Sequence, residues 1–168
     1  MWSRVIMLTT VLLMEGCSGE PVTGPVETKW DRDTCERCRM VLSDPHFAAQ
    51  IRYYPEGKKR PVVEKFDDIG CAVLWLQDKP WKDDGRTEFW VADHRTKKWI
   101  DAINATYVYK KTTPMEYGLG AQPEAIAGGI SFEKAKVHIA DVEERFNVHG
   151  LQLQQRLKQQ ALEREKIK

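Results

Sequence analysis

The stretch that decides the fold is residues 47–77, which read FAAQIRYYPEGKKRPVVEKFDDIGCAVLWLQ. Two parts of it, residues 47–54 and 60–66, are rich in β-branched and aromatic side chains and flank the turn PEGK. They therefore predict a β-hairpin. The pair Asp67-Asp68 then precedes an apolar run, and this order predicts a helix over residues 69–77 that the acidic pair caps.

A similar order of elements follows in the second half of the chain. Strands are predicted over residues 87–92, 98–102 and 107–111, and a loop rich in Gly and Pro separates them from a helix over residues 131–146. Two successive strand-and-helix segments predict an α+β fold built of two related small β-rich units, each with a helix. The polar residues 151–168 predict an exposed helical tail at the C-terminus.

The N-terminus is typical of a lipoprotein signal peptide over residues 1–16. Arg4 precedes a mainly apolar region of ten residues, 5–14, which would form only about 15 Å of helix, too short to cross a hydrocarbon core. The run ends at Gly16-Cys17, which resembles a bacterial lipobox and predicts that Cys17 is lipidated. Residues 17–29 then form a flexible tether to a domain over residues 30–150. We therefore expect an extracytoplasmic, lipid-anchored protein, on the periplasmic face of the outer membrane if the cell is Gram-negative.

The overall charge excludes one class of partner. The chain has 26 basic and 25 acidic residues among 168, a formal net charge of +1. No large positive field is available to attract nucleic acid. No Ser-His-Asp order, phosphate loop or pair of acids indicates catalysis, so we expect a protein that is not an enzyme.

A sulfur-rich segment, Cys35-Glu36-Arg37-Cys38-Arg39-Met40, follows the tether. Thiols and thioethers suit Cu(I) or zinc, and a thiol pair outside the cytosol forms a disulfide, a redox couple or a metal site. With Cys17 lipidated, three cysteines remain, and an odd number excludes a fully paired disulfide framework within one chain. Cys38 and Met40 would share one face of an extended strand. Met40 is equally well explained as the first core residue of that strand.

Two other readings of the Cys-x-x-Cys pair are less favoured. Structural zinc would need a second ligand pair, and the scattered histidines lack zinc-finger spacing. A thioredoxin-like centre would place the pair at the start of a helix, where the dipole lowers the thiol pKa. Here Cys38 precedes a short extended run, so redox catalysis by Cys35 and Cys38 is kept only as the alternative.

Three further residues, Met115, His46 and His94, are candidates for the same chemistry, whereas Cys71 is not. Cys71 lies in the first turn of the predicted helix and is interpreted as a core thiol. Met115 lies between Pro114 and Gly118 in a loop where it has no core face to join, and its thioether suits a soft cation. His46 and His94 lie in predicted turns and are candidate nitrogen ligands.

At these residues the chain resembles the NosL family, lipoproteins that deliver copper to nitrous oxide reductase. The resemblance extends over roughly residues 35–146, and its segments are specific when taken together. They are Cys35-x-x-Cys38-x-Met40, Phe47-Ala48-Ala49-Gln50-Ile51, Phe66-Asp67-Asp68-Ile69-Gly70-Cys71, Trp99-Ile100-Asp101-Ala102, Ala105-x-Tyr107-Val108 and Thr113-Pro114-Met115-x-Tyr117-Gly118.

The resemblance implies one Cu(I) per chain, bound by Cys and Met sulfur with a nitrogen or oxygen donor. Cys38 and Met40 match the family's Cys-Gly-Met element, and Met115 matches its Thr-Pro-Met element. Cys35 matches only the branch that has a second Cys, and Arg39 stands where the family usually has Gly. We therefore expect a copper chaperone in denitrification, whose partner is nitrous oxide reductase or its assembly machinery.

Overall fold

A four-stranded antiparallel sheet lies at the centre of the structure, a computed structural model that describes residues 21–166. The strands run in the order β2-β1-β3-β4. Ala49 lies opposite Phe66 in the predicted hairpin and opposite Val91 on its other side, so the two predicted segments share one sheet. With the helices described below, this confirms the predicted α+β class. The strands are β1 (Ala49–Tyr53), β2 (Val62–Phe66), β3 (Glu88–Ala92) and β4 (Trp99–Asp101).

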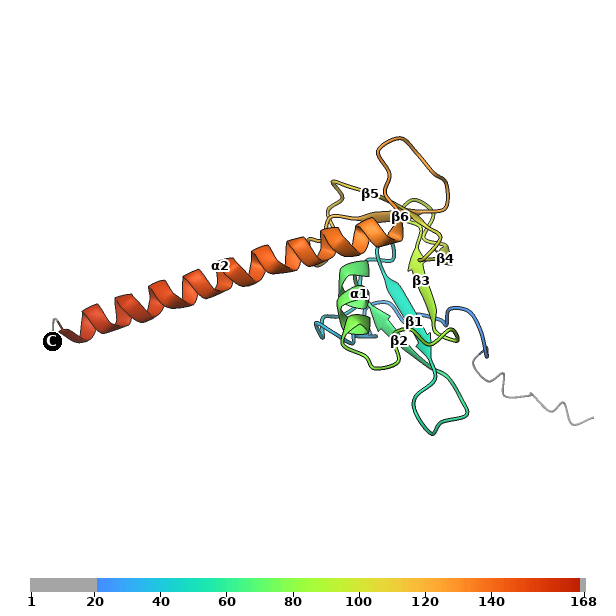
Figure 1. Ribbon diagram of the computed structural model, residues 1–168, viewed down its shortest axis with the longest axis horizontal. Helices are drawn as coiled ribbons and strands as arrows, with labels where there is room; N and C mark the ends of the chain where they lie inside the picture. Colours follow the sequence, from blue (N-terminus) through green and yellow to red (C-terminus); the bar gives the residue numbers. More distant parts are fainter. Residues whose placement is uncertain (1–20, 167–168) are drawn as a thin grey trace, which may run out of the picture.

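Helix α1 (Ile69–Gln77) spans the predicted residues and lies against the sheet (Figure 1). Asp68 is its N-cap, with extended backbone and a carboxylate that accepts a hydrogen bond from the Gly70 N–H at 2.9 Å. The first five residues of the helix are buried. The cap therefore lies deep in the fold, and side chains on either side of it point into the protein rather than into water.

Strands β5 (Thr106–Val108) and β6 (Gly120–Gln122) form a second, two-stranded antiparallel sheet. β5 overlaps the predicted third strand. The sequence does not predict β6, because Gly-Ala-Gln has no β-branched or aromatic side chain and lies within a loop rich in Gly and Pro. Its three residues are nevertheless buried. Gly120 is needed there, since a Cβ would come within 2.5 Å of the His94 ring.

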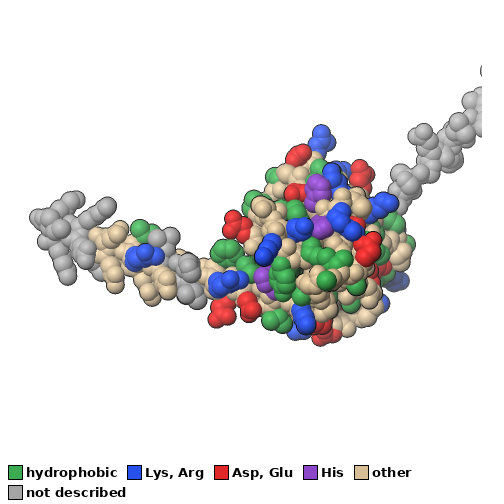
Figure 2. All heavy atoms as spheres, turned by 90° about the horizontal axis from the view of Figure 1, so that it is seen from above, with side chains coloured by type: hydrophobic (Ala, Val, Ile, Leu, Met, Phe, Trp, Pro, Cys, Tyr) green, Lys and Arg blue, Asp and Glu red, His purple; other side chains and the backbone are tan. Residues whose placement is uncertain are grey.

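Helix α2 (Phe132–Lys166) begins against the body and then projects far beyond it (Figures 1 and 2). Ala135, Ile139 and Val142 are buried in the core, whereas Leu151 and Leu157 are exposed. The predicted helix and the predicted polar tail are thus parts of one continuous helix. Within residues 21–166, no helix is both long enough and apolar enough to cross a membrane.

The two segments also share a six-residue turn, which we name the first turn (residues 35–40) and the second turn (residues 93–98). In each, the N–H of the first residue donates to the C=O of the sixth, and the N–H of the fifth donates to the C=O of the first. The fifth residue has a positive φ in both, 65° at Arg39 and 62° at Lys97. The first turn is followed by β1, β2 and α1, and the second turn by β4, β5, β6 and α2. The bonds are Cys35 to Met40 (2.8 Å), Arg39 to Cys35 (3.0 Å), Asp93 to Lys98 (2.8 Å) and Lys97 to Asp93 (2.8 Å).

Part of the predicted tether packs on the sheet. Val26 is buried, and the side chain of Gln50 accepts from its N–H at 2.8 Å and donates to its C=O at 2.9 Å. The Arg52 guanidinium donates to the Gly24 carbonyl at 2.7 and 2.9 Å. These contacts depend on polar side chains of β1, which is why hydrophobic periodicity does not reveal them. The predicted signal peptide and Cys17 lie outside the described residues.

Candidate metal centre

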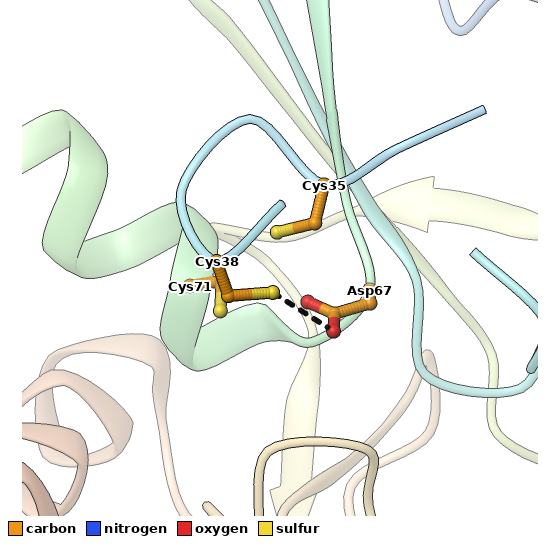
Figure 3. A group of neighbouring side chains, drawn as sticks. All are labelled: Cys35, Cys38, Asp67 and Cys71. Carbon is orange, nitrogen blue, oxygen red and sulfur yellow. Dashed lines mark hydrogen bonds between the residues drawn. The ribbon is translucent and has the colours of Figure 1, made fainter. Parts of the chain in front are cut away.

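Four donor groups meet at the N-terminal end of α1 (Figure 3). The Sγ atoms of Cys35, Cys38 and Cys71 and a carboxylate oxygen of Asp67 all lie within 4.8 Å of one another. The first turn supplies Cys35 and Cys38, and Asp67 directly follows β2. Cys71 is the third residue of α1. All three cysteines are unpaired thiols. We name these four residues the thiol cluster.

The thiol cluster is closed on one side and open on the other. Cys35 and Cys71 are fully buried, and Cys38 is only partly buried. The Cys38 thiol donates a hydrogen bond to Asp67 Oδ2 at 3.2 Å, whereas Asp67 Oδ1 is buried without a partner. An unpaired buried oxygen costs about 1–3 kcal/mol. The cluster therefore has an unused donor atom of the kind that a bound cation would satisfy.

The thiols differ in how readily they ionise. Hydrogen bonding with the Cys71 thiol lowers the pKa of Cys35, and the backbone N–H groups of Cys38 and Asp67 act in the same direction against burial. Burial raises the pKa of Cys38. The hydrogen bond to Cys35, together with burial, raises the pKa of Cys71. The metal-free cluster thus ionises first at Cys35, and a cation must displace the protons of the other two thiols.

Arg39 takes the conformation that glycine favours. Its φ of 65° is left-handed, which costs a residue with a Cβ about 1–2 kcal/mol. The side chain is 68% exposed and pairs with Glu36 at 2.8 Å. The turn therefore keeps a glycine-like shape although its residue is Arg. The same φ shows that the interpretation of Cys38 and Met40 as neighbours on one face of an extended strand is wrong.

The two methionine candidates have different surroundings. Met40 is 50% exposed, so its interpretation as a core residue is wrong, and its role as a ligand stays a prediction. Met115 is half-buried and packs against the core. Its N–H donates to Asp68 Oδ2 at 3.3 Å, and Asp68 adjoins Asp67 of the thiol cluster. The fold therefore brings the Met115 loop beside the cluster from a distance of 47 residues along the chain.

Neither histidine candidate belongs to the thiol cluster. Among the described residues, this cluster is the group whose donor atoms all lie within 4.8 Å of one another. His46 lies at the surface with its Nδ1 2.8 Å from Asp44. His94 is the second residue of the second turn; its side chain is 8% exposed, and its Nδ1 lies 4.0 Å from Asp93 Oδ1 without a hydrogen-bond partner. Burial lowers the pKa of His94.

The sequence does not identify Asp67 and Cys71 as members of a site. It assigns Asp67 to a helix cap and Cys71 to the core, and Cys71 is indeed buried. Asp67 precedes the N-cap and Cys71 lies in the first turn of the helix, so both are at the same helix end. This proximity is the one signal in the sequence that could have placed them together. The sequence does not show that the first turn packs there, through the hydrogen bond from Glu36 N–H to the Lys65 carbonyl at 2.9 Å.

The thiol cluster supplies the second ligand pair that the sequence lacked. Thiolates suit Cu(I) and zinc, and zinc also accepts a carboxylate oxygen. The four donors therefore form a group that could bind a metal ion without identifying which ion. No protein-family model, no curated protein and no solved structure matches this chain. The residues of the cluster are accordingly the basis for a function of this protein.

Proposed function

We propose that this protein is an extracytoplasmic, lipid-anchored Cu(I)-binding protein that delivers copper to an exported copper enzyme. The resemblance given above makes nitrous oxide reductase or its assembly machinery the recipient. The observation that carries the proposal is the convergence of three unpaired thiols, of which Cys38 is partly exposed.

The donor types favour Cu(I) over hard cations. Three thiols lie within 4.8 Å of one another, and the Met115 loop is hydrogen-bonded to the residue next to the cluster. Sulfur donors select Cu(I) and zinc over Mg²⁺ and Ca²⁺. We therefore assign one Cu(I) per chain to Cys35, Cys38 and Cys71, with the thioether of Met115 as a further donor and that of Met40 as the donor that the resemblance adds.

The burial pattern supports delivery rather than permanent storage. Cys35 and Cys71 are fully buried, so an incoming ligand reaches the cluster from the side of Cys38. Ligand exchange at one accessible donor allows an ion to pass to a recipient without unfolding the site. A permanently held structural ion would be enclosed on all sides.

Competition with bathocuproine disulfonate under anaerobic conditions tests the proposal. The protein should bind one Cu(I) per chain, and Cys38→Ser should lower the affinity by about 100-fold, which corresponds to about 2.7 kcal/mol. Thr96→Ser is the matched control, because Thr96 occupies the place of Cys38 in the second turn. Wild-type affinity in Cys38→Ser would refute the assignment.

Zinc is the second candidate ion, because the unpartnered Asp67 Oδ1 adds an oxygen to three thiols. Competition between the two metals separates the candidates. A copper carrier should retain Cu(I) in the presence of equimolar Zn²⁺. Asp67→Asn should weaken zinc binding far more than Cu(I) binding, since Cu(I) prefers sulfur.

A thiol-disulfide oxidoreductase remains the alternative from another class, because the pKa of Cys35 is lowered. Cys35 is fully buried, however, and the pair lies in a hairpin turn rather than at a helix start. An insulin-reduction assay distinguishes the two functions, since a copper carrier should be inert in it. Met40→Ala should leave such redox activity intact while weakening Cu(I) binding.

The recipient is tested by mixing the copper-loaded protein with metal-free nitrous oxide reductase and following the reductase's copper absorption bands. The reductase should gain copper faster from this protein than from an equal concentration of a Cu(I)–glutathione complex. Equal rates would refute nitrous oxide reductase as the recipient.

A further inference from the structure

Three polar side chains form a bridge beside the thiol cluster. The Arg37 guanidinium donates to Glu143 Oε1 at 2.6 Å and to the Tyr117 hydroxyl at 3.2 Å. The Tyr117 hydroxyl donates to Glu143 Oε2 at 2.7 Å. The Arg37 and Glu143 side chains are only 29% and 27% exposed, and Tyr117 is buried. Charge-assisted bonds shielded in this way are stronger than neutral or exposed ones.

The bridge joins the segments that carry the proposed ligands. Arg37 lies inside the first turn, between Cys35 and Cys38. Tyr117 lies two residues after Met115, and its ring lies so close to Gly70 that a Cβ there would come within 2.2 Å of it. Gly70 adjoins Cys71, so the bridge and its ring contact reach all three sulfur-bearing segments.

Glu143 belongs to α2, and none of the described side chains of this helix belongs to the thiol cluster. Its carboxylate is the acceptor that both other members of the bridge share. The first turn and the Met115 loop are thus held together through a third element. A change at Glu143 detaches both of them from α2 and leaves only the Arg37–Tyr117 hydrogen bond between them, although it removes no donor atom from the cluster.

A surface cavity lies directly over the bridge. It has a volume of about 410 Å³ and is lined by Arg37, Met115, Tyr117, Glu143 and the half-exposed Phe146, together with Pro114 and Glu116. The cavity is open to solvent, so it gives access to the Met115 side of the site. Any loosening of the bridge widens this access.

We propose that Arg37, Tyr117 and Glu143 act as positioning residues that hold the Met115 loop against the first turn and thereby limit the rate at which the site exchanges its ion. This inference rests on the proposed function, which assigns Met115 to the copper site. Glu143 acts through Met115 and touches no ion itself.

The rate of Cu(I) transfer to excess bathocuproine disulfonate, measured by stopped flow on the loaded protein, tests the inference. Glu143→Gln should speed transfer by about tenfold, since bonds to charged groups are worth that much. Glu144→Gln, one residue away on an exposed position of the same helix, should stay within about twofold. Tyr117→Phe keeps the ring on Gly70 and removes only the hydroxyl, so it should also speed transfer.

A double-mutant cycle separates positioning from general destabilisation. In a Met115→Ala protein the thioether is already absent, so Glu143→Gln should add little to the transfer rate. A purely structural role would give effects that multiply independently. Independent effects, or unchanged transfer in both Glu143→Gln and Tyr117→Phe, would overturn the inference.

Thiol reactivity in the metal-free protein keeps the inference separate from copper binding. Reaction of the cysteines with Ellman's reagent should be several-fold faster in Glu143→Gln than in Glu144→Gln, because the first turn is less firmly held. Faster reaction in a protein that binds no Cu(I) would refute the proposed function and the part assigned to Met115, while leaving the bridge as the element that holds the turn. Equal rates would overturn the bridge itself.

Discussion

The first and second turns share their backbone hydrogen bonds and differ in how their side chains find partners. Both close with the same pair of hydrogen bonds and the same left-handed fifth residue. In the second turn the first side chain, Asp93, is satisfied locally by the Arg95 N–H at 3.0 Å and the Thr96 hydroxyl at 2.9 Å. In the first turn the corresponding side chain is Cys35, whose main side-chain partner, Cys71, lies in another segment.

The comparison separates what the fold needs from what the site adds. The second turn forms without any cysteine, so thiols are not required to make this backbone. Although burial opposes ionisation, hydrogen bonds from Arg95 and Thr96 lower the pKa of Asp93 to about 2, which marks a stable internal cap. The first turn instead leaves Asp67 Oδ1 unpaired beside three thiols. The backbone of the turn therefore does not account for the cysteines, which belong to a group that could bind a metal ion.

The largest expected effect comes from Cys71, which distinguishes a ligand from a core residue. Cys71→Ala should lower Cu(I) affinity by roughly 100-fold, or about 2.7 kcal/mol, while costing only about 1 kcal/mol of folding stability. Val73→Ala is the matched control, because it removes buried volume from the same helix without removing sulfur. If both variants keep wild-type affinity, Cys71 is a core thiol and the site is smaller than proposed.

The pH dependence of Cu(I) binding also distinguishes thiols that bind the ion from thiols that only fill the core. The pKa values of Cys38 and Cys71 are raised, so both thiols are protonated at neutral pH and must lose their protons when Cu(I) binds. Affinity should therefore fall by about 100-fold for each unit of decreasing pH near neutrality. In Cys38→Ser one proton is no longer displaced, while the Cys71 hydrogen bond that lowers the pKa of Cys35 is kept, so the slope should fall to about tenfold per unit. A flat profile would show that the thiols do not bind as thiolates.

The second residues of α1 and α2 differ in burial, and we therefore expect substitutions there to differ in their effect on stability. Gly70 is the second residue of α1, and a Cβ there would lie 2.2 Å from the Tyr117 ring. Gly70→Ala should therefore destabilise the protein by about 3 kcal/mol, measured by urea unfolding. Glu133 is the second residue of α2 and its side chain is 76% exposed. Glu133→Ala should change stability by less than about 0.5 kcal/mol, and an equal loss in both would contradict the ring contact.

Local pattern predicts much of this fold and only part of the site. The hairpin of β1 and β2, helix α1 and its Asp68 cap follow from alternation, turn residues and an acidic pair before an apolar run. Strand β6 does not, because its residues have no strand signal and are held by burial. Cys35 and Cys38 stand out by spacing, whereas Asp67 and Cys71 join them only through the packing of the first turn on β2 and α1. Such contacts across the chain leave no periodic trace in the sequence.

Substitution of Asp93 tests whether the second turn stabilises the fold. Because its pKa is lowered to about 2 from 3.8, its ionised form stabilises the fold above about pH 4, and this contribution is lost as the pH falls through about 2. Asp93→Asn should lower stability at pH 7 by about 1–2 kcal/mol and flatten the loss between pH 4 and 2. Cu(I) affinity should not change. Weakened copper binding in this variant would show that the two turns are coupled.

The smallest expected effect comes from the left-handed residues that the turns share. Arg39 and Lys97 each have a positive φ, which costs about 1–2 kcal/mol, and glycine removes this strain while adding about 0.5–1 kcal/mol of backbone entropy loss. Arg39→Gly and Lys97→Gly should each stabilise the protein by about 0.5–1 kcal/mol in urea unfolding, and their effects should add. The exposed Arg39–Glu36 pair contributes little against this gain. Arg39→Gly should also leave Cu(I) affinity unchanged, because the residue contributes shape and no donor. If Arg39→Gly lowers the Cu(I) affinity and Lys97→Gly does not, the charge of Arg39 acts on the thiol cluster.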